Sequence, residues 1–255
     1  MSTTARVKEQ FGENAAFYLT HAPHAQGKSL DMLVELTKPQ RDWHMLDVAT
    51  GGGHVAYTFA PHVARVWATD ITDEMLTQVR NEAKKRGLTN IRTALAKAEM
   101  LPFEDASLDL ITCRVAPHHF DSIPDFLAET ARVLKPNGTL AIVDNVVPSG
   151  SVGDYVNAFE RFRDPSHLRS WTIEEWKTAL AQAGYTVTQS ELLFKRMVFN
   201  TWAGRHDPVM LRSLRSMLIE MTPGVAGYFD VRNPDGDLDF RLSEALFIAK
   251  RQPKS

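Results

Sequence analysis

The sequence predicts a doubly wound α/β fold built on a mostly parallel sheet. Two patterns carry this prediction. Short apolar strands alternate with amphipathic helices from about residue 44 to residue 144, and a glycine turn follows the first of those strands. Alternation of this kind gives right-handed βαβ crossovers and a sheet covered by helices on both faces. The composition, 44% hydrophobic and 24% charged, is that of a globular chain with enough apolar material for a core.

The first half of the chain supplies five expected strands. In order they are residues 45–48, 63–69, 90–95, 108–113 and 139–143. Helices are expected over 54–60, from Asp73 as the capping residue to Gly87, and from Pro124 to about residue 134. The second of these helices is the best defined, because Met75, Leu76, Val79 and Ala83 share one apolar face.

After residue 145 the alternation changes. Residues 149–170 and 199–228 have the spacing of helical insertions. Between them, Thr172 and Glu175 form a capping box that opens a helix ending near Gly184. Residues 185–193 and 243–250 are expected to be the remaining strands.

Charge and cysteine content exclude several classes of function. The 29 basic and 31 acidic side chains give a formal charge of −2, spread along the chain, so no nucleic-acid partner is expected. One cysteine cannot form an intramolecular disulfide, and His21 and His24 lack neighbouring ligands, so no metal is expected. No segment approaches the ~20 apolar residues of a membrane span. The expected location is therefore the cytoplasm.

A ligand site is expected at the glycine turn. Gly51 to Ala56 fits the pattern G-x-G-x-x-A between a strand and a helix, which by itself fits a dinucleotide equally well. Asp70 ends the second strand 19 residues after Gly51, where a carboxylate accepts hydrogen bonds from ribose hydroxyls. Asp47 precedes the turn, and its charge would repel a pyrophosphate but suits the sulfonium and ammonium groups of S-adenosylmethionine.

These motifs resemble those of a known family. Residues 46–53 resemble the glycine motif of class I S-adenosylmethionine-dependent methyltransferases. Residues 98–103, 107–111 and 131–140 are similar to motifs of the ubiquinone/menaquinone-biosynthesis-like (type 11) branch. Phe11-Gly12 with Tyr18 resembles the lid at the N-terminus of that branch. The resemblance covers roughly residues 7–148 and weakens beyond residue 150.

The resemblance implies a Rossmann-like sheet of seven strands whose last strand is antiparallel. It also implies one domain over 1–255, with the lid and cofactor core in 1–148, a helical cap in 149–170 and 199–228, and the rest of the sheet in 171–198 and 229–255. The residues expected to contact the cofactor are Asp47, Gly51, Gly52, Gly53, Asp70, Ile71, Met75, Ala98, Glu99, Arg114 and Val115.

Two positions depart from the family pattern. Ala49 replaces the first glycine of the commonest motif, which is tolerable where the backbone φ is negative. Lys97 stands where an aspartate often meets the adenine amino group, and a lysine cannot accept that hydrogen bond. Glu99 or a backbone carbonyl is expected to take its place.

The predicted function is transfer of a methyl group to an O or C atom of a small molecule. His118 or His119, just past the fourth strand, is the candidate general base, with simple packing as the alternative. Arg114 fits either an anionic acceptor or an ion pair. The candidate substrate or lid residues are Phe11, Tyr18, Tyr155, Phe159 and His167. A nicotinamide-dependent oxidoreductase, a non-catalytic S-adenosylmethionine-binding module and a homodimer remain open.

Overall fold

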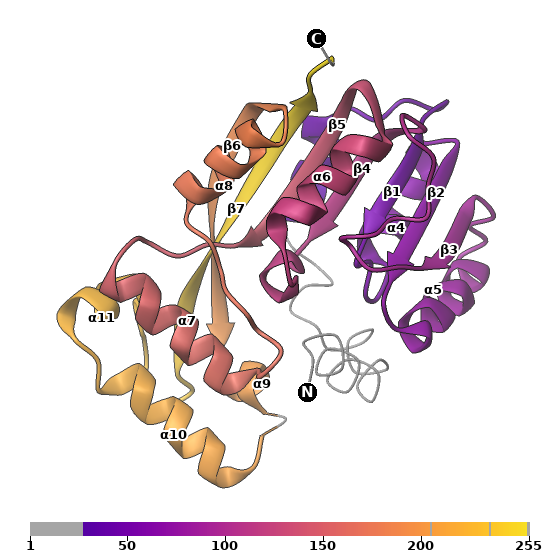
Figure 1. Ribbon diagram of the computed structural model, residues 1–255. Helices are drawn as coiled ribbons and strands as arrows, with labels where there is room; N and C mark the ends of the chain where they lie inside the picture. The colour runs from indigo at the N-terminus through magenta and orange to yellow at the C-terminus, as the bar shows by residue number, and fades with distance from the viewer. Residues whose placement is uncertain (1–27, 205, 235, 254–255) are drawn as a thin grey trace.

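The computed structural model describes residues 28–204, 206–234 and 236–253. Seven strands form one sheet in the order β3-β2-β1-β4-β5-β7-β6 (Figure 1). The strands are β1 His44–Val48, β2 Arg65–Asp70, β3 Ile91–Leu95, β4 Leu108–Arg114, β5 Leu134–Asn145, β6 Tyr185–Val198 and β7 Asp239–Arg251. The pairs among β1 to β5 are parallel, whereas β7 is antiparallel to both β5 and β6. The predicted sheet with its antiparallel last strand is therefore confirmed.

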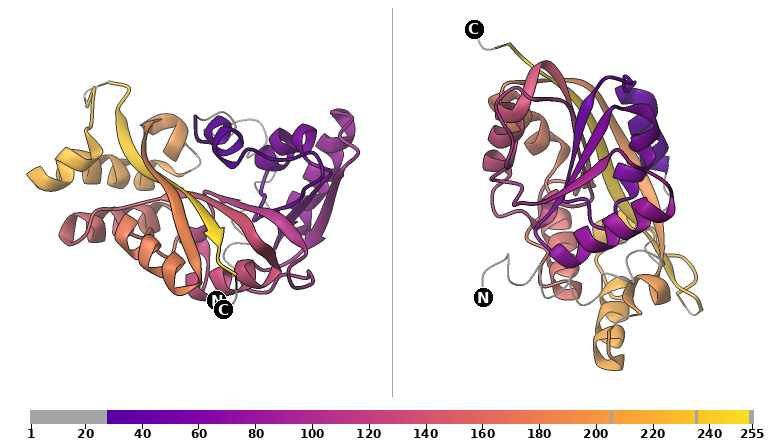
Figure 2. Two further views of the ribbon diagram at one scale, coloured as in Figure 1. Left: turned by 90° about the horizontal axis from the view of Figure 1, so that it is seen from above. Right: turned by 90° about the vertical axis from the view of Figure 1, so that its right-hand side faces the viewer.

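Helices cover both faces of the sheet. They are α3 Lys28–Thr37, α4 His54–Phe59, η1 Ala60–His62, α5 Asp73–Lys85, η2 Pro117–His119, α6 Ile123–Val133, α7 Ser151–Arg163, α8 Ile173–Gln182, α9 Phe199–Ala203, α10 Pro208–Ile219 and α11 Pro223–Phe229. Helices α3, α4 and α5 lie on one face, and α6 and α8 lie on the other (Figure 2). Because side chains of a strand alternate between the two faces, Met45 packs with the first set and Leu46 with the second.

The far halves of β6 and β7 carry a helical cap. These two strands pair from Tyr185 opposite Arg251 to Val198 opposite Asp239, with one register shift between Val187 and Gln189, and they extend well beyond the end of β5. Helices α7, α9, α10 and α11 pack around this extension (Figure 1). The core of the cap contains Phe159, Trp202, Phe229 and Phe240, separate from the two clusters on the sheet.

Two of the expected boundaries are wrong. Thr72, and not Asp73, is the N-cap of α5, and its hydroxyl donates to Asp70 Oδ1 at 2.6 Å. Strand β5 begins at Leu134, because residues after α6 already pair with β4 through an irregular register at Leu108. The capping box of Thr172 and Glu175 is confirmed.

Among the described residues, no helix combines the length and apolar character needed to cross a lipid bilayer.

Candidate functional site

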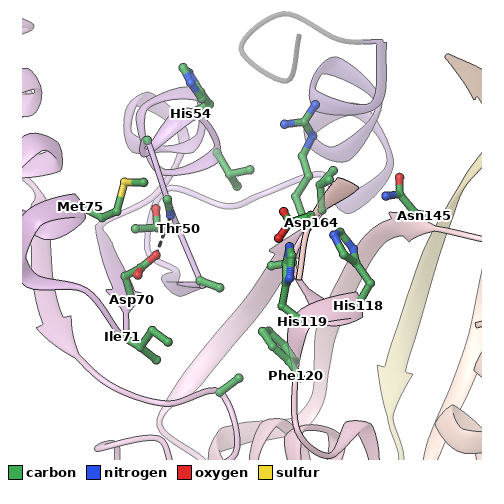
Figure 3. Close-up of a pocket in the computed structure, with 18 of the residues that line it drawn as sticks. Thr50, His54, Asp70, Ile71, Met75, His118, His119, Phe120, Asn145 and Asp164 are labelled. Carbon is green, nitrogen blue, oxygen red and sulfur yellow. Dashed lines mark hydrogen bonds between the residues drawn. The ribbon is translucent and has the colours of Figure 1, made fainter. Parts of the chain in front are cut away.

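A cavity of about 250 Å³ lies between the carboxyl ends of the parallel strands and the cap. Asp70, Ile71 and Met75 lie on one side of it, and His118, His119, Asp164 and Asn145 lie on the other (Figure 3). Ligand sites in open α/β sheets form at this edge of the sheet. The residues predicted from sequence that line the cavity are Asp47, Gly51, Gly52, Asp70, Ile71, Met75, Ala98, Glu99, Arg114, Val115, His118 and His119.

The turn after β1 uses left-handed backbone at three residues. Ala49 has φ 52°, Gly51 φ 50° and Gly53 φ 81°. The expectation that Ala49 has a negative φ is therefore wrong. The chain reverses sharply here, because the Thr50 N–H donates to the Thr69 carbonyl and the Gly53 N–H to the Thr50 carbonyl. Placing a residue other than glycine in the left-handed region costs about 1–2 kcal/mol of conformational energy. In this protein the residue is Ala49, which lines the cavity.

Gly51 and Gly53 are required for different reasons. A Cβ added to Gly51 would meet no atom within 4 Å, and Gly51 lines the cavity, so its missing side chain leaves the loop backbone open to a ligand. A Cβ on Gly53 would lie 2.6 Å from the Tyr57 ring. Gly53 is the N-cap of α4 and is not among the residues that line the cavity. The structure thus gives Gly53 a packing role.

Asp47 is held as a buried acceptor beneath this loop. Its Oδ2 accepts from the Thr50 hydroxyl at 2.6 Å, and its Oδ1 accepts from the Thr112 hydroxyl at 2.9 Å. Burial raises the pKa of Asp47 to about 6, although the two threonine hydrogen bonds oppose that shift. The carboxyl group therefore favours a cationic ligand, since a nearby positive charge stabilises its ionised form.

Asp70 connects the glycine loop to helix α5. Its Oδ2 accepts from the Gly51 N–H at 3.0 Å, and its Oδ1 accepts from the backbone N–H and hydroxyl of Thr72. Burial raises the pKa of Asp70, and these hydrogen bonds oppose the increase. Oδ2 accepts one hydrogen bond here and has a second lone-pair site, so the side chain retains acceptor capacity.

The segment at the expected adenine edge is tied to the start of α6. Glu99 Oε1 accepts from the Asp121 N–H at 3.0 Å and from the Ser122 N–H at 3.4 Å. Lys97 Nζ lies 3.7 Å from Asp121 Oδ2. Lys97 is thus placed as a partner of Asp121, and Glu99 orients the loop that carries the histidines.

The end of β4 is strained where it enters the cavity. Val115 has φ 54°, an outlier for a β-branched residue. Its N–H donates to the Val143 carbonyl at 2.7 Å, which holds this conformation. Arg114 donates from Nε to Ser29 Oγ at 3.2 Å, and burial lowers the pKa of its guanidinium. Strained backbone persists at functional sites when the surrounding structure determines it.

His118 forms a buried pair with Asp144 at the end of β5. Nδ1 of His118 lies 2.6 Å from Asp144 Oδ1, and the two side chains are 7% and 1% exposed. Because a carboxylate only accepts, the Nδ1 proton is shared with Asp144 and the neutral ring carries its lone pair on Nε2. Burial lowers the pKa of His118, but Asp144 offsets this effect and the net shift is upward.

His119 and His167 complete a cluster of three histidines. The rings of His118 and His119 are 4.2 Å apart, and those of His118 and His167 are 5.2 Å apart. Burial and the charge on His118 lower the pKa of His119 to about 3 and that of His167 to about 2. His118 is thus the most basic member of the cluster.

The loop after α7 brings the cap onto this cluster. The Leu168 and Arg169 N–H groups donate to the His118 carbonyl, and Nδ1 of His119 lies 3.0 Å from the Ser166 carbonyl oxygen. The loop keeps its shape because Asp164 Oδ1 accepts from the N–H and the hydroxyl of Ser166. His167 pairs through Nε2 with Asn157 Oδ1 at 3.1 Å, so it supports the loop and is not among the residues lining the cavity.

Two other predicted contact residues lie in the cap core. Phe159 is fully buried and stacks on Trp202 with a centroid distance of 5.2 Å. Tyr155 packs against Phe229 and donates its hydroxyl proton to the Met217 carbonyl at 2.7 Å. Neither lines the cavity, because their side chains fill the space between α7 and the other cap helices. Phe11 and Tyr18, like His21 and His24, lie outside the described residues.

Sequence reasoning missed five charged residues of the site. They are Asp144, Glu160, Arg163, Lys195 and Glu244. Asp144 and Glu244 each stand at the end of an apolar strand segment, and this was the signal available in the sequence. Within the described ranges, no group of three or more His, Cys, Asp or Glu residues has the arrangement of a metal site.

Comparison with known proteins is consistent across sequence and structure. The model of a family described as a methyltransferase domain matches residues 46–142. The chain is 38% identical to the uncharacterized methyltransferase YcgJ of Bacillus subtilis (strain 168) over 66% of each chain. It is 34% identical to the ubiquinone/menaquinone biosynthesis C-methyltransferase UbiE of Paracoccus denitrificans, over 44% of this chain and 46% of that protein. The match thus spans about two thirds of the first relative's length and less than half of the second's.

A solved structure shows the same fold over most of the chain. The crystal structure of a candidate methyltransferase (BH2331) from Bacillus halodurans C-125 superposes with a TM-score of 0.85 at 32% identity, covering 89% of this chain and all of that one. These similarities point to the same family as the sheet order and as the glycine loop with its two carboxylates. This chain belongs to the class I S-adenosylmethionine-dependent methyltransferases, in the ubiquinone/menaquinone-biosynthesis-like branch.

Proposed function

We propose that this protein transfers the methyl group of S-adenosylmethionine to an O or C atom of a small molecule, with His118 as the general base. One observation carries the proposal. A single cavity is lined by Asp47, Gly51 and Asp70, and also by His118, which pairs with Asp144. Asp70 and His118 lie on opposite sides of it (Figure 3). The first set suits the donor, and the second suits an acceptor that must lose a proton.

The donor side of the cavity fits S-adenosylmethionine. Gly51 leaves a gap in the cavity wall that any side chain would fill, and it stands beside the buried carboxyl group of Asp47 and the half-buried carboxyl group of Asp70. Asp70 retains acceptor capacity for ribose hydroxyls, and Asp47 favours the positive charges at the methionine end. We assign Gly51, Gly52 and Asp47 to the methionine end, Asp70 to the ribose, and Ile71, Met75, Ala98 and Glu99 to the adenine.

Within this proposal, His118 removes the proton that the acceptor loses. When bound, S-adenosylmethionine would supply an electrophilic methyl group: the acceptor atom would bond to the methyl carbon as the opposite C–S bond breaks and S-adenosylhomocysteine leaves. Nε2 of His118 takes up the acceptor's proton, and the Asp144 carboxylate stabilises the resulting imidazolium. His119 is less suited to this role, because its low pKa makes it a weak base. Arg114 and Val115, at the end of β4, position the acceptor beside the donor.

The acceptor side also bears on the two alternative functions. A non-catalytic binding module has no need for a buried His–Asp pair beside the cavity. A nicotinamide-dependent oxidoreductase would place a pyrophosphate beside Asp47, which carries negative charge in its ionised form. Neither alternative is favoured by a feature of this cavity.

Titration calorimetry with S-adenosylhomocysteine tests the donor site. Wild-type protein is expected to bind with a Kd in the micromolar range, and Asp70→Asn to weaken binding at least tenfold by losing charged acceptors. Asp73→Asn is the matched control, since Asp73 begins α5 nearby with an exposed side chain. Wild-type protein that binds NADH but not S-adenosylhomocysteine would refute the proposal.

A further inference from the structure

The cap end of the cavity holds two buried carboxylates that the proposed methyl transfer does not use. Glu160 on α7 is 4% exposed, and Glu244 on β7 is 5% exposed. Each lies beside a cation, with Glu160 Oε2 at 3.3 Å from Arg163 Nη2 and Glu244 Oε1 at 3.6 Å from Lys195 Nζ. All four residues line the cavity.

These groups are incompletely hydrogen-bonded. In the part of the chain that the structure describes, Glu160 Oε1, Glu244 Oε1 and Arg163 Nε have no hydrogen-bond partner. Leaving a buried charged group unsatisfied is unfavourable, and most such atoms in folded proteins are paired. At the donor end, by contrast, both oxygens of Asp47 and both oxygens of Asp70 accept hydrogen bonds.

An aromatic wall stands beside these charges. Trp202 lines the cavity, and the Arg163 guanidinium carbon lies 4.6 Å from the centre of its ring. Behind Trp202, Phe159 and Phe240 pack at centroid distances of 5.2 Å and 4.9 Å. On the cap side, the cavity is therefore lined by the Trp202 ring together with the Arg163–Glu160 ion pair.

We propose that the methyl acceptor is a small polar molecule that presents hydroxyl or amino hydrogen-bond donors to Glu160 and Glu244. This inference rests on the proposed function and names the substrate class for the same site. Two carboxylates and two cations balance one another here, so the acceptor carries little net charge. A long hydrocarbon tail at this end would place apolar groups against carboxylate oxygens that have no hydrogen-bond partner among the described residues, which argues against a prenylated quinone.

The test uses labelled S-adenosylmethionine and matched probes. Catechol and 2-aminophenol are flat and differ by one hydroxyl or amino group, and a monoprenylated naphthoquinol is the apolar comparison. Each is assayed with the wild type, Glu160→Gln, Glu244→Gln and Asp154→Asn, with S-adenosylhomocysteine affinity measured in parallel. Asp154 is the matched control, because it is an exposed carboxylate on α7 outside the cavity lining.

The wild type is expected to methylate catechol or 2-aminophenol. Glu160→Gln and Glu244→Gln should each raise the KM of that compound at least tenfold, with the S-adenosylhomocysteine Kd unchanged within twofold. A larger loss for 2-aminophenol than for catechol would identify the amino group as the donor. The two glutamates lie on different elements, so one variant remains informative if the other fails to fold.

Two results would overturn this inference. One is turnover of the naphthoquinol with kinetics that neither substitution changes. The other is wild-type protein that binds S-adenosylhomocysteine yet methylates neither polar probe. Failure of the proposed function is distinguishable, because it would appear as absent S-adenosylhomocysteine binding by the wild type.

Discussion

At the residue scale, the two loop glycines have different roles: Gly53 is needed for stability and Gly51 for ligand binding. Ala substitution at Gly53 adds a Cβ 2.6 Å from the Tyr57 ring at φ 81°, so it combines a clash with backbone strain. Ala at Gly51 meets only open space and bears the strain alone. We expect Gly53→Ala to lower the free energy of unfolding by about 2 kcal/mol or more, and Gly51→Ala by about 1 kcal/mol.

Urea unfolding and calorimetry together test this distinction. Gly51→Ala should weaken S-adenosylhomocysteine binding at least tenfold, because its methyl group projects into the cavity. Gly53→Ala should retain most of its affinity in the fraction that remains folded. Equal stability losses with equal losses of affinity would contradict the separate roles.

The His118–Asp144 pair predicts a specific pH dependence. A general base acts in its neutral form, and the pKa of His118 is raised above 6.5, so kcat should increase with pH through that raised value. Asp144→Asn removes the charge that opposes the effect of burial on the pKa of His118. Glu160 and Asp164 still favour the protonated ring, and His119 and His167 stay close to it. The acidic limb should therefore move to lower pH.

The same substitution should lower kcat by about 100-fold, because the imidazolium loses its counter-charge and the ring its fixed tautomer. The pH profile of kcat, measured with any acceptor that the enzyme turns over, decides the matter. A lower kcat with an unshifted acidic limb would show that Asp144 only supports packing.

At the scale of elements, the loop from residue 164 to 169 makes the protein sensitive to acid. His167 is buried and neutral, with its pKa lowered to about 2 by burial and by the charges on the neighbouring histidines. Below pH 6.5 the unfolded chain binds a proton that the folded chain does not, so the free energy of unfolding decreases as the pH is lowered. Between pH 6.5 and pH 5 this amounts to about 2 kcal/mol from His167.

His167→Gln tests this linkage, because glutamine retains a donor for Asn157 and does not titrate. The loss of unfolding free energy between pH 7 and pH 5 should be about 2 kcal/mol smaller in this variant than in the wild type. His118 acts with the opposite sign, since its pKa is raised, and it is common to both proteins. His62→Gln, at an exposed site on η1, is the control for exchanging a histidine for glutamine.

Short sequence patterns predicted which helices and strands are present better than they predicted the residues at which those elements begin and end. The capping box of Thr172 and Glu175 is a short-range pattern, and the structure reproduces it. Asp73 also has the sequence of a cap, but the neighbouring Thr72 takes that position because Asp70, from the preceding strand, fixes its backbone. Likewise, no local pattern shows that β5 starts at Leu134, because that start depends on pairing with β4.

At the scale of the whole molecule, the donor half of the site was readable from sequence and the acceptor half was not. Asp47, Gly51 and Asp70 sit at the ends of consecutive strands, so one motif and one spacing locate them. The acceptor half combines residues from η2, β5, α7 and the paired strands β6 and β7. His118 and the carbonyl-binding Leu168 are 50 positions apart, and only the docking of the cap brings them together.

That docking leads to a prediction about cooperativity. Strands β6 and β7 run without interruption from the sheet into the cap, and the loop from residue 164 to 169 bonds to His118 beside the sheet. Sheet and cap should therefore unfold in one transition. S-adenosylhomocysteine at 100 times its Kd should stabilise the folded state by about 2.7 kcal/mol, which raises the Tm of a chain of this size by about 5–10 °C.

Differential scanning calorimetry with and without the ligand tests this coupling. Trp202 fluorescence follows the cap in the same samples after the four tryptophans of the sheet side, Trp43, Trp67, Trp171 and Trp176, are replaced by phenylalanine. One calorimetric transition that moves together with the Trp202 signal is expected. Two transitions, of which the ligand shifts only the one not seen by Trp202, would show that the cap is an independent unit. In that case a ligand bound at the glycine loop would not stabilise the cap, because the sheet and the cap would unfold independently of each other.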